Sequence, residues 1–368
     1  MAKQHGGNVW LAEETYGVQQ EQILDFSANI NPLGPSPKAI TALQRSVDQI
    51  RHYPEPQARA LRGELAKVTG VPEELLILGN GAAELIYALG RVLKPKRVLL
   101  PTPTFSEYAE GFTEVVPVFL PLNPVNDFAL LAEAIEPVVQ RGDLLIICNP
   151  NNPTGQLVDQ QQLRALLDKV GQLGANLLID EAFMDFVEPE QSLLKEIQHH
   201  PHLLILRSLT KFFAIPGLRL GYLAASTKVV ESLHKVLPPW RVNHLAQVAG
   251  VASLQDQTYI QQTLELVDQQ RAMLFSALAG IPGLRPLAPA ANFILVDCHA
   301  SGITAREIQN YLGPRGILIR LCANFSGLDE YYFRVAVRSE RENSLLIKNL
   351  QDIFSKRTYH QIIQTDNK

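Results

Sequence analysis

The sequence has few cysteines, little net charge and no long apolar stretch. Its three cysteines are Cys148, Cys298 and Cys322, and no two of them form a CxxC pair. We therefore expect reduced, mostly buried thiols rather than disulfides or a metal site. The net charge of -4 supplies neither a basic surface for nucleic acid nor a polybasic patch for a membrane.

Membrane-directed segments are also missing. The first ten residues, MAKQHGGNVW, lack the apolar stretch of a signal peptide. No apolar run approaches the roughly 18 residues that a membrane span requires. Internal repeats and low-complexity linkers are absent from the sequence as well. Together these features predict a soluble, cytoplasmic, globular protein.

Short apolar runs alternate with longer amphipathic stretches along most of the chain. The runs that we interpret as strands lie at 75–78, 97–100, 144–148, 176–179, 203–206, 220–223, 292–296, 317–321 and 333–337. Helices are expected from about residue 82, and at 160–173, 259–278, 304–312 and 342–354. Short, uniformly apolar strands separated by helices predict a mostly parallel sheet that helices cover on both faces.

The length of the chain, 368 residues, exceeds what one hydrophobic core usually supports. We therefore predict an α/β protein with an N-terminal arm at 1–34, a large domain at 35–270 and a smaller α+β C-terminal domain at 271–368. Ligands of such sheets bind at the carboxyl ends of the strands. The residues that follow each strand are therefore the first candidates for a functional site.

A glycine-rich turn follows the strand at 75–78. Gly81, Ala82 and Ala83 lie where a helix begins, and free backbone N–H groups there could bind a phosphate. The turn is neither a Walker loop nor a good dinucleotide-binding fingerprint, because no Gly-Lys-Ser/Thr follows and Glu84 occupies the sixth position. By itself, a plain turn between strand and helix explains it equally well.

Polar groups also follow the next strands along the chain. Asn152 lies in the turn after 144–148, and Asp180 comes directly after 176–179. The segment after 203–206 carries Ser208, Thr210 and Lys211, and eight residues later comes an arginine, Arg219. Taken singly, each is explained by a turn former, a helix cap or a solvated surface group.

As a set, these residues match the needs of pyridoxal phosphate (PLP). That cofactor requires a lysine for a Schiff base and a carboxylate against the pyridine nitrogen. It also requires a donor for the ring hydroxyl and a phosphate site. Lys211 and Asp180 meet the first two needs, Asn152 meets the third, and the glycine-rich turn with Ser208, Thr210 and Arg219 meets the fourth. A lysine in an apolar pocket has the lowered pKa that such chemistry needs, and two phenylalanines follow Lys211 directly.

Three motifs carry a resemblance to a known family. They are Asn-Pro-Thr-Gly at 152–155, Asp-Glu-Ala at 180–182 and Ser-x-Thr-Lys at 208–211. The chain resembles, over nearly its whole length, the aminotransferase superfamily of fold-type-I PLP enzymes. Within it, HGGN at 5–8, DFSANINPLG at 25–34 and the segment around 320–339 resemble the threonine-phosphate decarboxylases of cobalamin synthesis. Histidinol-phosphate aminotransferases are similar as well.

The resemblance implies a role for each matching residue. Lys211 would hold the cofactor and later donate a proton, and Asp180 would keep the pyridine nitrogen protonated. Asn152 would contact the ring hydroxyl, and Tyr108 would stack on the ring. Tyr53 is similar to the tyrosine that reaches the cofactor phosphate of a neighbouring subunit, which implies a homodimer.

The same resemblance implies a substrate that carries both a carboxylate and a phosphate. Its ligands would be His5, Gly6 and Asn29 from the arm, with Arg320 and Arg334 from the small domain. Guanidinium groups match both anions. Without the resemblance, each arginine reads as a surface ion pair and His5 as a mobile terminus.

Two departures from the family pattern bear on the reaction. Ala82 and Ala83 stand where polar residues occur in the decarboxylases, although backbone N–H groups can still bind phosphate. Phe183 replaces a tyrosine of many aminotransferases, which removes a hydroxyl near the ring and favours the decarboxylase branch.

The expected activity is the decarboxylation of L-threonine O-3-phosphate, with no metal. The arm and the arginines would hold the substrate carboxylate upright on the ring. Three other interpretations stay open: a histidinol-phosphate aminotransferase, a non-catalytic PLP-binding sensor, and a scaffold protein whose turns have no chemical role. The sequence alone does not decide between decarboxylation and transamination, because that choice depends on small differences in placement.

Overall fold

The computed structural model describes residues 6–365, with side chains up to Ser355, and divides into two compact units. Unit 2 comprises Leu33–Asn152 and Gln156–Leu264. Unit 1 comprises the described residues up to Pro32, the short segment Pro153–Gly155 and the described residues from Glu265 onward. Among the described residues, no helix combines the length and the apolar character that crossing a membrane requires.

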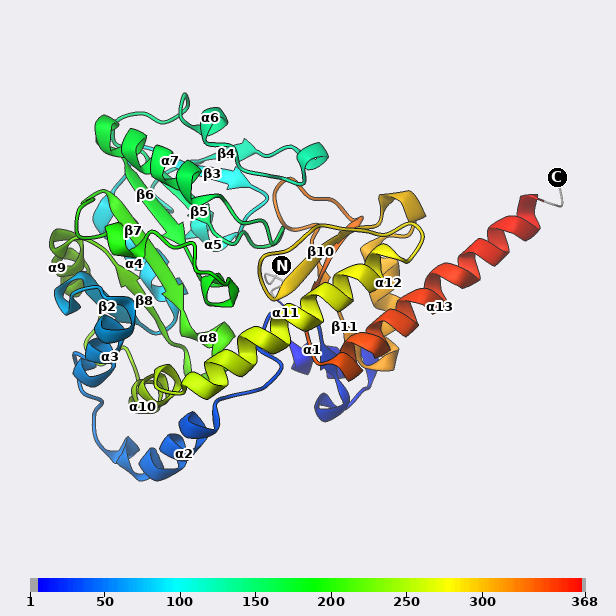
Figure 1. Cartoon of the computed structure of the whole chain (residues 1–368), viewed down its shortest axis with the longest axis horizontal. Coiled ribbons are helices and arrows are strands. Elements are labelled where there is room, and N and C mark those ends of the chain that lie inside the picture. The colour runs from blue at the N-terminus through cyan, green and yellow to red at the C-terminus, as the bar shows by residue number, and fades with distance from the viewer. Residues whose placement is uncertain (1–5, 366–368) are drawn as a thin grey trace. The chain divides into compact units, whose positions relative to one another are not determined.

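A seven-stranded sheet forms the centre of unit 2 (Figure 1), with strand order β2-β8-β7-β6-β5-β3-β4. Its strands are β2 (Leu76–Gly79), β3 (Val98–Thr102), β4 (Pro117–Pro121), β5 (Leu144–Cys148), β6 (Asn176–Asp180), β7 (Leu203–Ser208) and β8 (Gly221–Ala224). The strands from β7 to β4 are parallel, and β8 is antiparallel to both of its neighbours. The predicted mostly parallel sheet is therefore confirmed, with β8 as its one antiparallel member.

Helices make up much of the rest of unit 2. They are α2 (Pro37–Ser46), α3 (Arg59–Thr69), α4 (Ala82–Leu93), α5 (Glu107–Glu110), α6 (Ala132–Ile135), α7 (Gln160–Leu173), α8 (Leu209–Phe212), α9 (Thr227–Val236), α10 (His244–Leu254) and the start of α11 (Gln257–Ala279). Successive strand residues point to opposite faces. Leu144, Ile146 and Cys148 of β5 pack in one hydrophobic cluster with α4 and α9. Every residue of β5 is buried, which explains why its sequence is apolar without alternation.

Unit 1 contains a smaller, four-stranded antiparallel sheet of order β12-β13-β10-β9. The elements of the unit are α1 (Val9–Tyr16), β1 (Leu24–Asp25), β9 (Arg285–Pro286), β10 (Phe293–Asp297), α12 (Ala305–Leu312), β11 (Ile317–Leu318), β12 (Arg320–Leu321), β13 (Tyr332–Ala336) and α13 (Glu340–Thr365). The strand predicted at 317–321 is in fact split between β11 and β12. β11 pairs with β1 of the N-terminal segment, so this segment is part of unit 1.

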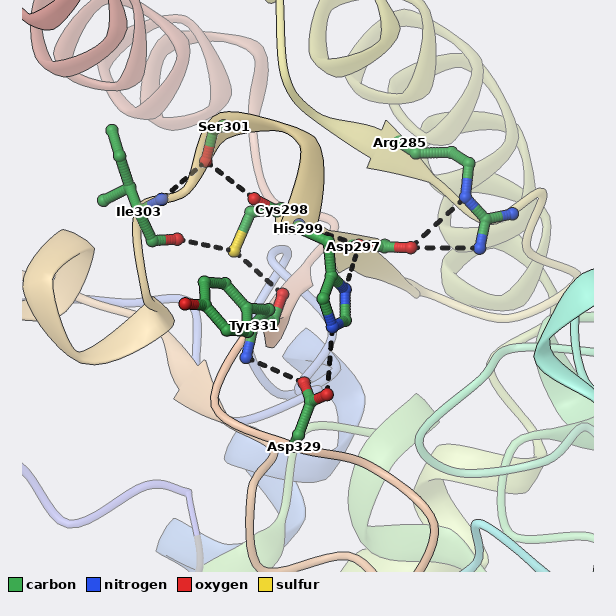
Figure 2. A network of polar contacts seen from close by, with 8 residues as sticks. All are labelled: Arg285, Asp297, Cys298, His299, Ser301, Ile303, Asp329 and Tyr331. Carbon is green, nitrogen blue, oxygen red and sulfur yellow. Dashed lines mark hydrogen bonds and ion pairs between the residues drawn. The ribbon is translucent and has the colours of Figure 1, made fainter.

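A polar network fixes the segment that joins β12 to β13 (Figure 2). His299 follows β10 and lies between two carboxylates, with Nδ1 2.7 Å from Asp297 and Nε2 2.9 Å from Asp329. Arg285 of β9 binds the same Asp297 at 3.1 Å. Tyr331 accepts from the Cys298 thiol at 2.8 Å through its carbonyl oxygen. These contacts attach the last residues of the joining segment to the residues that directly follow β10.

The protonation of His299 sets the strength of this attachment. Burial lowers the pKa of His299, but hydrogen bonds and charges from Asp297 and Asp329 outweigh that effect and raise the pKa above its ordinary value. Because the pKa of His299 is higher in the folded state, the charged imidazole contributes its full stabilisation below the ordinary pKa of about 6.5. This contribution is lost as the pH rises through the folded-state pKa.

We predict that wild type loses unfolding free energy relative to His299→Ala as the pH rises above about 6.5. The imidazole is 44% exposed, so solvent screening keeps the effect small. Urea unfolding of both proteins across this range measures it. Asp329→Asn, which removes one of the two carboxylates, should give an intermediate pH dependence. A wild-type advantage that is constant or grows with pH would contradict the assignment.

Candidate functional site

Three polar side chains meet on one face of the unit 2 sheet, at the carboxyl ends of β5, β6 and β7. Cys148 pairs in register with Asp180, and Asp180 pairs with Leu206. Ser208 lies two residues after Leu206 and therefore points to the same face. This face also packs α4 and α5, because Leu178, Leu206 and Cys148 belong to one hydrophobic cluster with them.

Tyr108 of α5 connects to this row through its hydroxyl. The Tyr108 Oη donates a 2.8 Å hydrogen bond to Asp180 Oδ2, and both side chains are buried. The backbone N–H of Ala182 donates to the other oxygen, Oδ1, at 2.9 Å. Burial raises the pKa of Asp180, whereas these two hydrogen bonds and the nearby charge of Lys211 act to lower it. The carboxylate therefore has two hydrogen-bond donors and a cation to offset its burial.

Lys211 lies on the four-residue helix α8 that follows β7 directly. Its Nζ donates to Thr210 Oγ1 at 3.2 Å, and Thr210 Oγ1 is 2.8 Å from Ser208 Oγ. Thr210 and Ser208 are buried, whereas Lys211 is partly exposed. The positive charge of Lys211 acts to lower the pKa of Asp180, so the two groups are close enough to interact electrostatically. The amine and the acid are thus brought together from neighbouring strand ends.

The glycine-rich turn before α4 adjoins a guanidinium group. Gly81 has φ +82°, and a Cβ built there would lie 2.7 Å from Arg219 Nη2. A Cβ on Gly221 of β8 would lie 2.6 Å from the backbone nitrogen of Ala82. No side chain caps the N-terminus of α4. The turn therefore combines the backbone N–H groups of Ala82 and Ala83 with an exposed arginine, as a phosphate site requires.

An ion cluster occupies the opposite face of the same strand ends. Arg207 of β7 donates from Nε to Glu181 at 2.7 Å and from Nη1 to Asp185 at 2.7 Å, and it also pairs with Glu190. Burial lowers the pKa of Arg207, but the three carboxylates outweigh it and raise the pKa well above its ordinary value. Because Glu181 follows Asp180 and Arg207 precedes Ser208, the cluster ties together the two strands that carry candidate residues.

Two further predicted cofactor residues also lie in unit 2. Asn152 is half-buried, and its backbone N–H donates to the Cys148 thiol at 3.4 Å. Tyr53 is 80% exposed and stacks on Trp240 with ring centroids 4.7 Å apart. Among the described residues Tyr53 contacts the ring of Trp240, and its role in a neighbouring subunit stays a prediction.

The two predicted substrate arginines are direct neighbours in unit 1. Arg320 of β12 pairs in register with Arg334 of β13, and both are buried. Arg320 donates to the Leu321 carbonyl at 2.7 Å and to Asn324 Oδ1 at 2.9 Å. Burial lowers the pKa of Arg334 to about 10, and the positive charge of Arg320 contributes to this shift. An anion bound beside both guanidinium groups would offset the cost of burying Arg334 and its repulsion from Arg320.

The N-terminal segment meets the same sheet. Arg334 Nη2 donates to the Ser27 carbonyl at 2.9 Å, and Asn292 donates to the Asn29 carbonyl at 3.1 Å. Asn29 Oδ1 is buried and accepts no hydrogen bond within the part of the chain that the structure describes. Gly6 packs on Ser27. His5 lies outside the described residues.

Three residues that contact predicted site residues escaped the sequence interpretation. Cys148 was read only as a buried thiol, yet it pairs with Asp180. Trp240 carries the ring on which Tyr53 stacks, and it has φ +54°. Ser27 contacts both Arg334 and the glycines of the N-terminal segment. The position of Ser27 inside DFSANINPLG was the one available signal.

The donor set suits PLP. An amine lies within electrostatic reach of a buried acid, and a glycine cradle with an arginine lies at the start of α4. The acid is held as an acceptor by Tyr108, which suits a partner that carries a proton on a ring nitrogen. Backbone atoms leave no room for a side chain at Gly221, and Gly81 has a positive φ that residues with a side chain rarely adopt. A phosphate can use the backbone N–H groups there.

Comparisons with known proteins agree with this fit. The family model described as aminotransferase class I and II matches residues 21–350. The chain is 38% identical to threonine-phosphate decarboxylase of Salmonella typhimurium over 354 residues, which cover 95% of this chain and 96% of that one. It is 33% identical to histidinol-phosphate aminotransferase of Methanothermobacter thermautotrophicus, covering 95% and 93%.

A solved structure is similar as well. The histidinol-phosphate aminotransferase from Clostridium acetobutylicum superposes with a TM-score of 0.85 at 29% identity, covering 91% of this chain and 100% of that one. The expected fold-type-I architecture is thereby confirmed, and so is the expected cofactor. The chain belongs to the aminotransferase class I and II family and is a PLP-dependent enzyme.

Proposed function

We propose that this enzyme decarboxylates L-threonine O-3-phosphate to (R)-1-aminopropan-2-yl phosphate, a step in cobalamin side-chain synthesis. The observation that carries the proposal is the buried, register-paired couple Arg320 and Arg334. Two adjacent guanidinium groups in a buried place favour a substrate with more than one negative charge. The proposal also rests on the 38% identity to a threonine-phosphate decarboxylase.

PLP supplies an electron sink, so that the substrate bond held perpendicular to its ring can break. The residues of this chain decide which bond that is. We propose that Arg320 and Arg334 bind the substrate anions with Gly6, Asn29 and His5, and hold the carboxylate upright. Carbon dioxide then leaves, and its bonding electrons stay with the α-carbon. Lys211 Nζ then donates a proton to that carbon, which replaces the lost carboxylate.

Asp180 would act on the pyridine nitrogen of the cofactor. Its charge must be retained in a buried place, and Tyr108 supports the charge by donating a hydrogen bond. Asn152 would meet the ring hydroxyl. Gly81, Ala82, Ala83, Ser208, Thr210 and Arg219 would bind the phosphate. Phe183 has no hydroxyl to offer at the ring, and it is buried.

A second copy of the chain would complete the site. Tyr53 and Trp240 form an exposed aromatic pair, and Ile50 nearby in sequence is 63% exposed. A contiguous patch of exposed apolar side chains is a feature of protein–protein interfaces. We propose a homodimer in which Tyr53 reaches the cofactor phosphate of the neighbouring subunit. A cytoplasmic location stays a prediction from the sequence.

Histidinol-phosphate aminotransferase is the second candidate, because a relative of that activity is 33% identical over 95% of the chain. Histidinol phosphate carries a phosphate but no carboxylate, whereas 2-oxoglutarate, the second substrate of that reaction, carries two carboxylates that an arginine can bind. A transamination would also convert the cofactor to its amine form, whereas a decarboxylation would leave the cofactor in its aldehyde form.

We expect purified, cofactor-loaded protein to convert L-threonine O-3-phosphate to carbon dioxide and aminopropanol phosphate. Parallel incubation with histidinol phosphate and 2-oxoglutarate should leave both compounds unchanged. Lys211→Arg keeps the charge but removes the reactive amine, so turnover should fall by about 10²–10⁴-fold, the range typical of a lost proton donor. Borohydride reduction followed by peptide mapping should label Lys211 in wild type only. Turnover of histidinol phosphate alone would replace the proposal with the aminotransferase.

We also predict that Tyr108→Phe shifts the pH dependence of cofactor binding. Loss of the hydroxyl removes a hydrogen bond that lowers the pKa of Asp180, so the pKa rises further. As the pH is lowered, Asp180 should therefore become protonated, and PLP affinity should decrease, at a higher pH in the variant than in wild type. At neutral pH it should be about two- to tenfold weaker, the value of one hydrogen bond.

Titration of apoprotein with PLP from acid to neutral pH measures this shift. Tyr87→Phe is the matched control, because its hydroxyl donates to the Glu107 carboxylate at 2.7 Å on the protein surface. That variant should behave as wild type. An unchanged pH midpoint in Tyr108→Phe would rule out the role given to the hydroxyl.

A further inference from the structure

Ser27 lies at the centre of the contacts that hold the N-terminal glycines in unit 1. The Gly7 N–H donates to Ser27 Oγ at 2.9 Å. A Cβ built on Gly6 would lie 2.1 Å from the Ser27 carbonyl oxygen, so Gly6 packs directly on that atom. The same oxygen accepts the 2.9 Å hydrogen bond from Arg334 Nη2. The carbonyl and the hydroxyl of one residue, Ser27, therefore link the glycines to a candidate substrate arginine.

Asp25 determines the direction in which the Ser27 hydroxyl points. Asp25 Oδ1 accepts from the Ser27 N–H at 2.8 Å and from the Ser27 Oγ at 2.5 Å. Because the hydroxyl proton is donated to a carboxylate, the lone pairs of Oγ are left to accept from Gly7. Asp25 is itself held, since its carbonyl accepts from Arg338 Nη1 at 3.1 Å. The hydroxyl is thus fixed as an acceptor.

The glycines cannot be replaced at this contact without displacement. A separation of 2.1 Å is far below any real carbon–oxygen contact, so a side chain at Gly6 would push the segment away from Ser27. Gly7 has φ +89°, a conformation that residues with a side chain rarely adopt. The segment and Ser27 therefore fit each other through backbone atoms and a single hydroxyl.

We propose that Ser27, oriented by Asp25, is a positioning residue that seats Gly6 and Gly7 at the substrate anion site of Arg334. This inference rests on the proposed function, which gives Gly6 and Arg334 to the substrate. Ser27 itself touches no substrate. It sets the affinity for the phosphorylated substrate, because it holds two groups of the anion site on the same carbonyl and hydroxyl.

Such a role affects substrate binding more than bond breaking. Lys211 and Asp180 belong to unit 2, and Ser27 makes none of its described contacts there. Removal of the hydroxyl should therefore raise the KM and leave kcat nearly unchanged. A defect in folding alone would lower the amount of active enzyme, and so kcat, without a change in KM.

The test compares cofactor-loaded wild type with Ser27→Ala. We expect the Gly7 amide to exchange its hydrogen about tenfold faster in Ser27→Ala, since one hydrogen bond near 1.4 kcal/mol is lost. The KM for L-threonine O-3-phosphate should rise about tenfold with kcat within about twofold, and the binding constant of inorganic phosphate should weaken in parallel. Gly6→Ala should give the same changes in KM and in phosphate binding through displacement of the segment.

Ser301→Ala is the matched control in the same unit. The Ser301 hydroxyl donates to the Cys298 carbonyl at 2.7 Å and accepts from the Ile303 N–H at 3.0 Å, so it bridges backbone groups as Ser27 does. This variant should match wild type in exchange at Gly7, in KM and in phosphate binding.

Two results would overturn the inference: unchanged exchange at Gly7 in Ser27→Ala, or faster exchange with unchanged phosphate binding. A wild-type protein without decarboxylase activity would refute the proposed function instead. The exchange and inorganic phosphate measurements need no turnover, so they would still decide the role of Ser27 in that case.

Discussion

The candidate site depends on the register of three parallel strands. Cys148, Asp180 and Ser208 share a face because β5, β6 and β7 pair as they do. A slip of one residue would exchange Asp180 for Glu181 on that face. The cluster of Arg207 with Glu181, Asp185 and Glu190 opposes such a slip, since it would leave charged groups buried without their partners. The ion cluster therefore holds the acid in place from the other side of the sheet.

We assign different chemical tasks to the two units. The residues that we assign to PLP are in unit 2, where an acid, an amine and a glycine cradle meet. Those that we assign to the substrate anions are in unit 1, where neighbouring strands present Arg320 and Arg334 side by side. The hairpin that bears the arginines is attached through His299, and the N-terminal glycines are attached through Ser27. Each unit thus contains buried charged side chains that hydrogen bonds orient: Asp180 in unit 2, and Arg320 and Arg334 in unit 1.

Much of the unit 2 sheet could be predicted from the sequence, because strands covered on both faces read as continuous apolar runs. The strand at 144–148 and the helix at 160–173 were predicted with the bounds that the structure has. β4 was missed, since its burial is only partial and prolines lie at both of its ends. Chemistry at the strand ends was visible because most of its residues lie shortly after an apolar run in the sequence. The hydrogen bonds from Tyr108 to Asp180 and from Arg334 to Ser27 were not predicted, because each joins residues that are far apart in the chain.

The central claim is that Lys211 would hold one PLP molecule covalently while Asp180 would bind the pyridine nitrogen of the same molecule. A crystal structure of the PLP-loaded enzyme tests it most directly. The account predicts continuous density between Lys211 Nζ and the cofactor, with an Asp180 oxygen about 2.6–3.0 Å from the pyridine nitrogen and within a charge-assisted hydrogen bond. A cofactor bound through another lysine, or a pyridine nitrogen that faces away from Asp180, would contradict it.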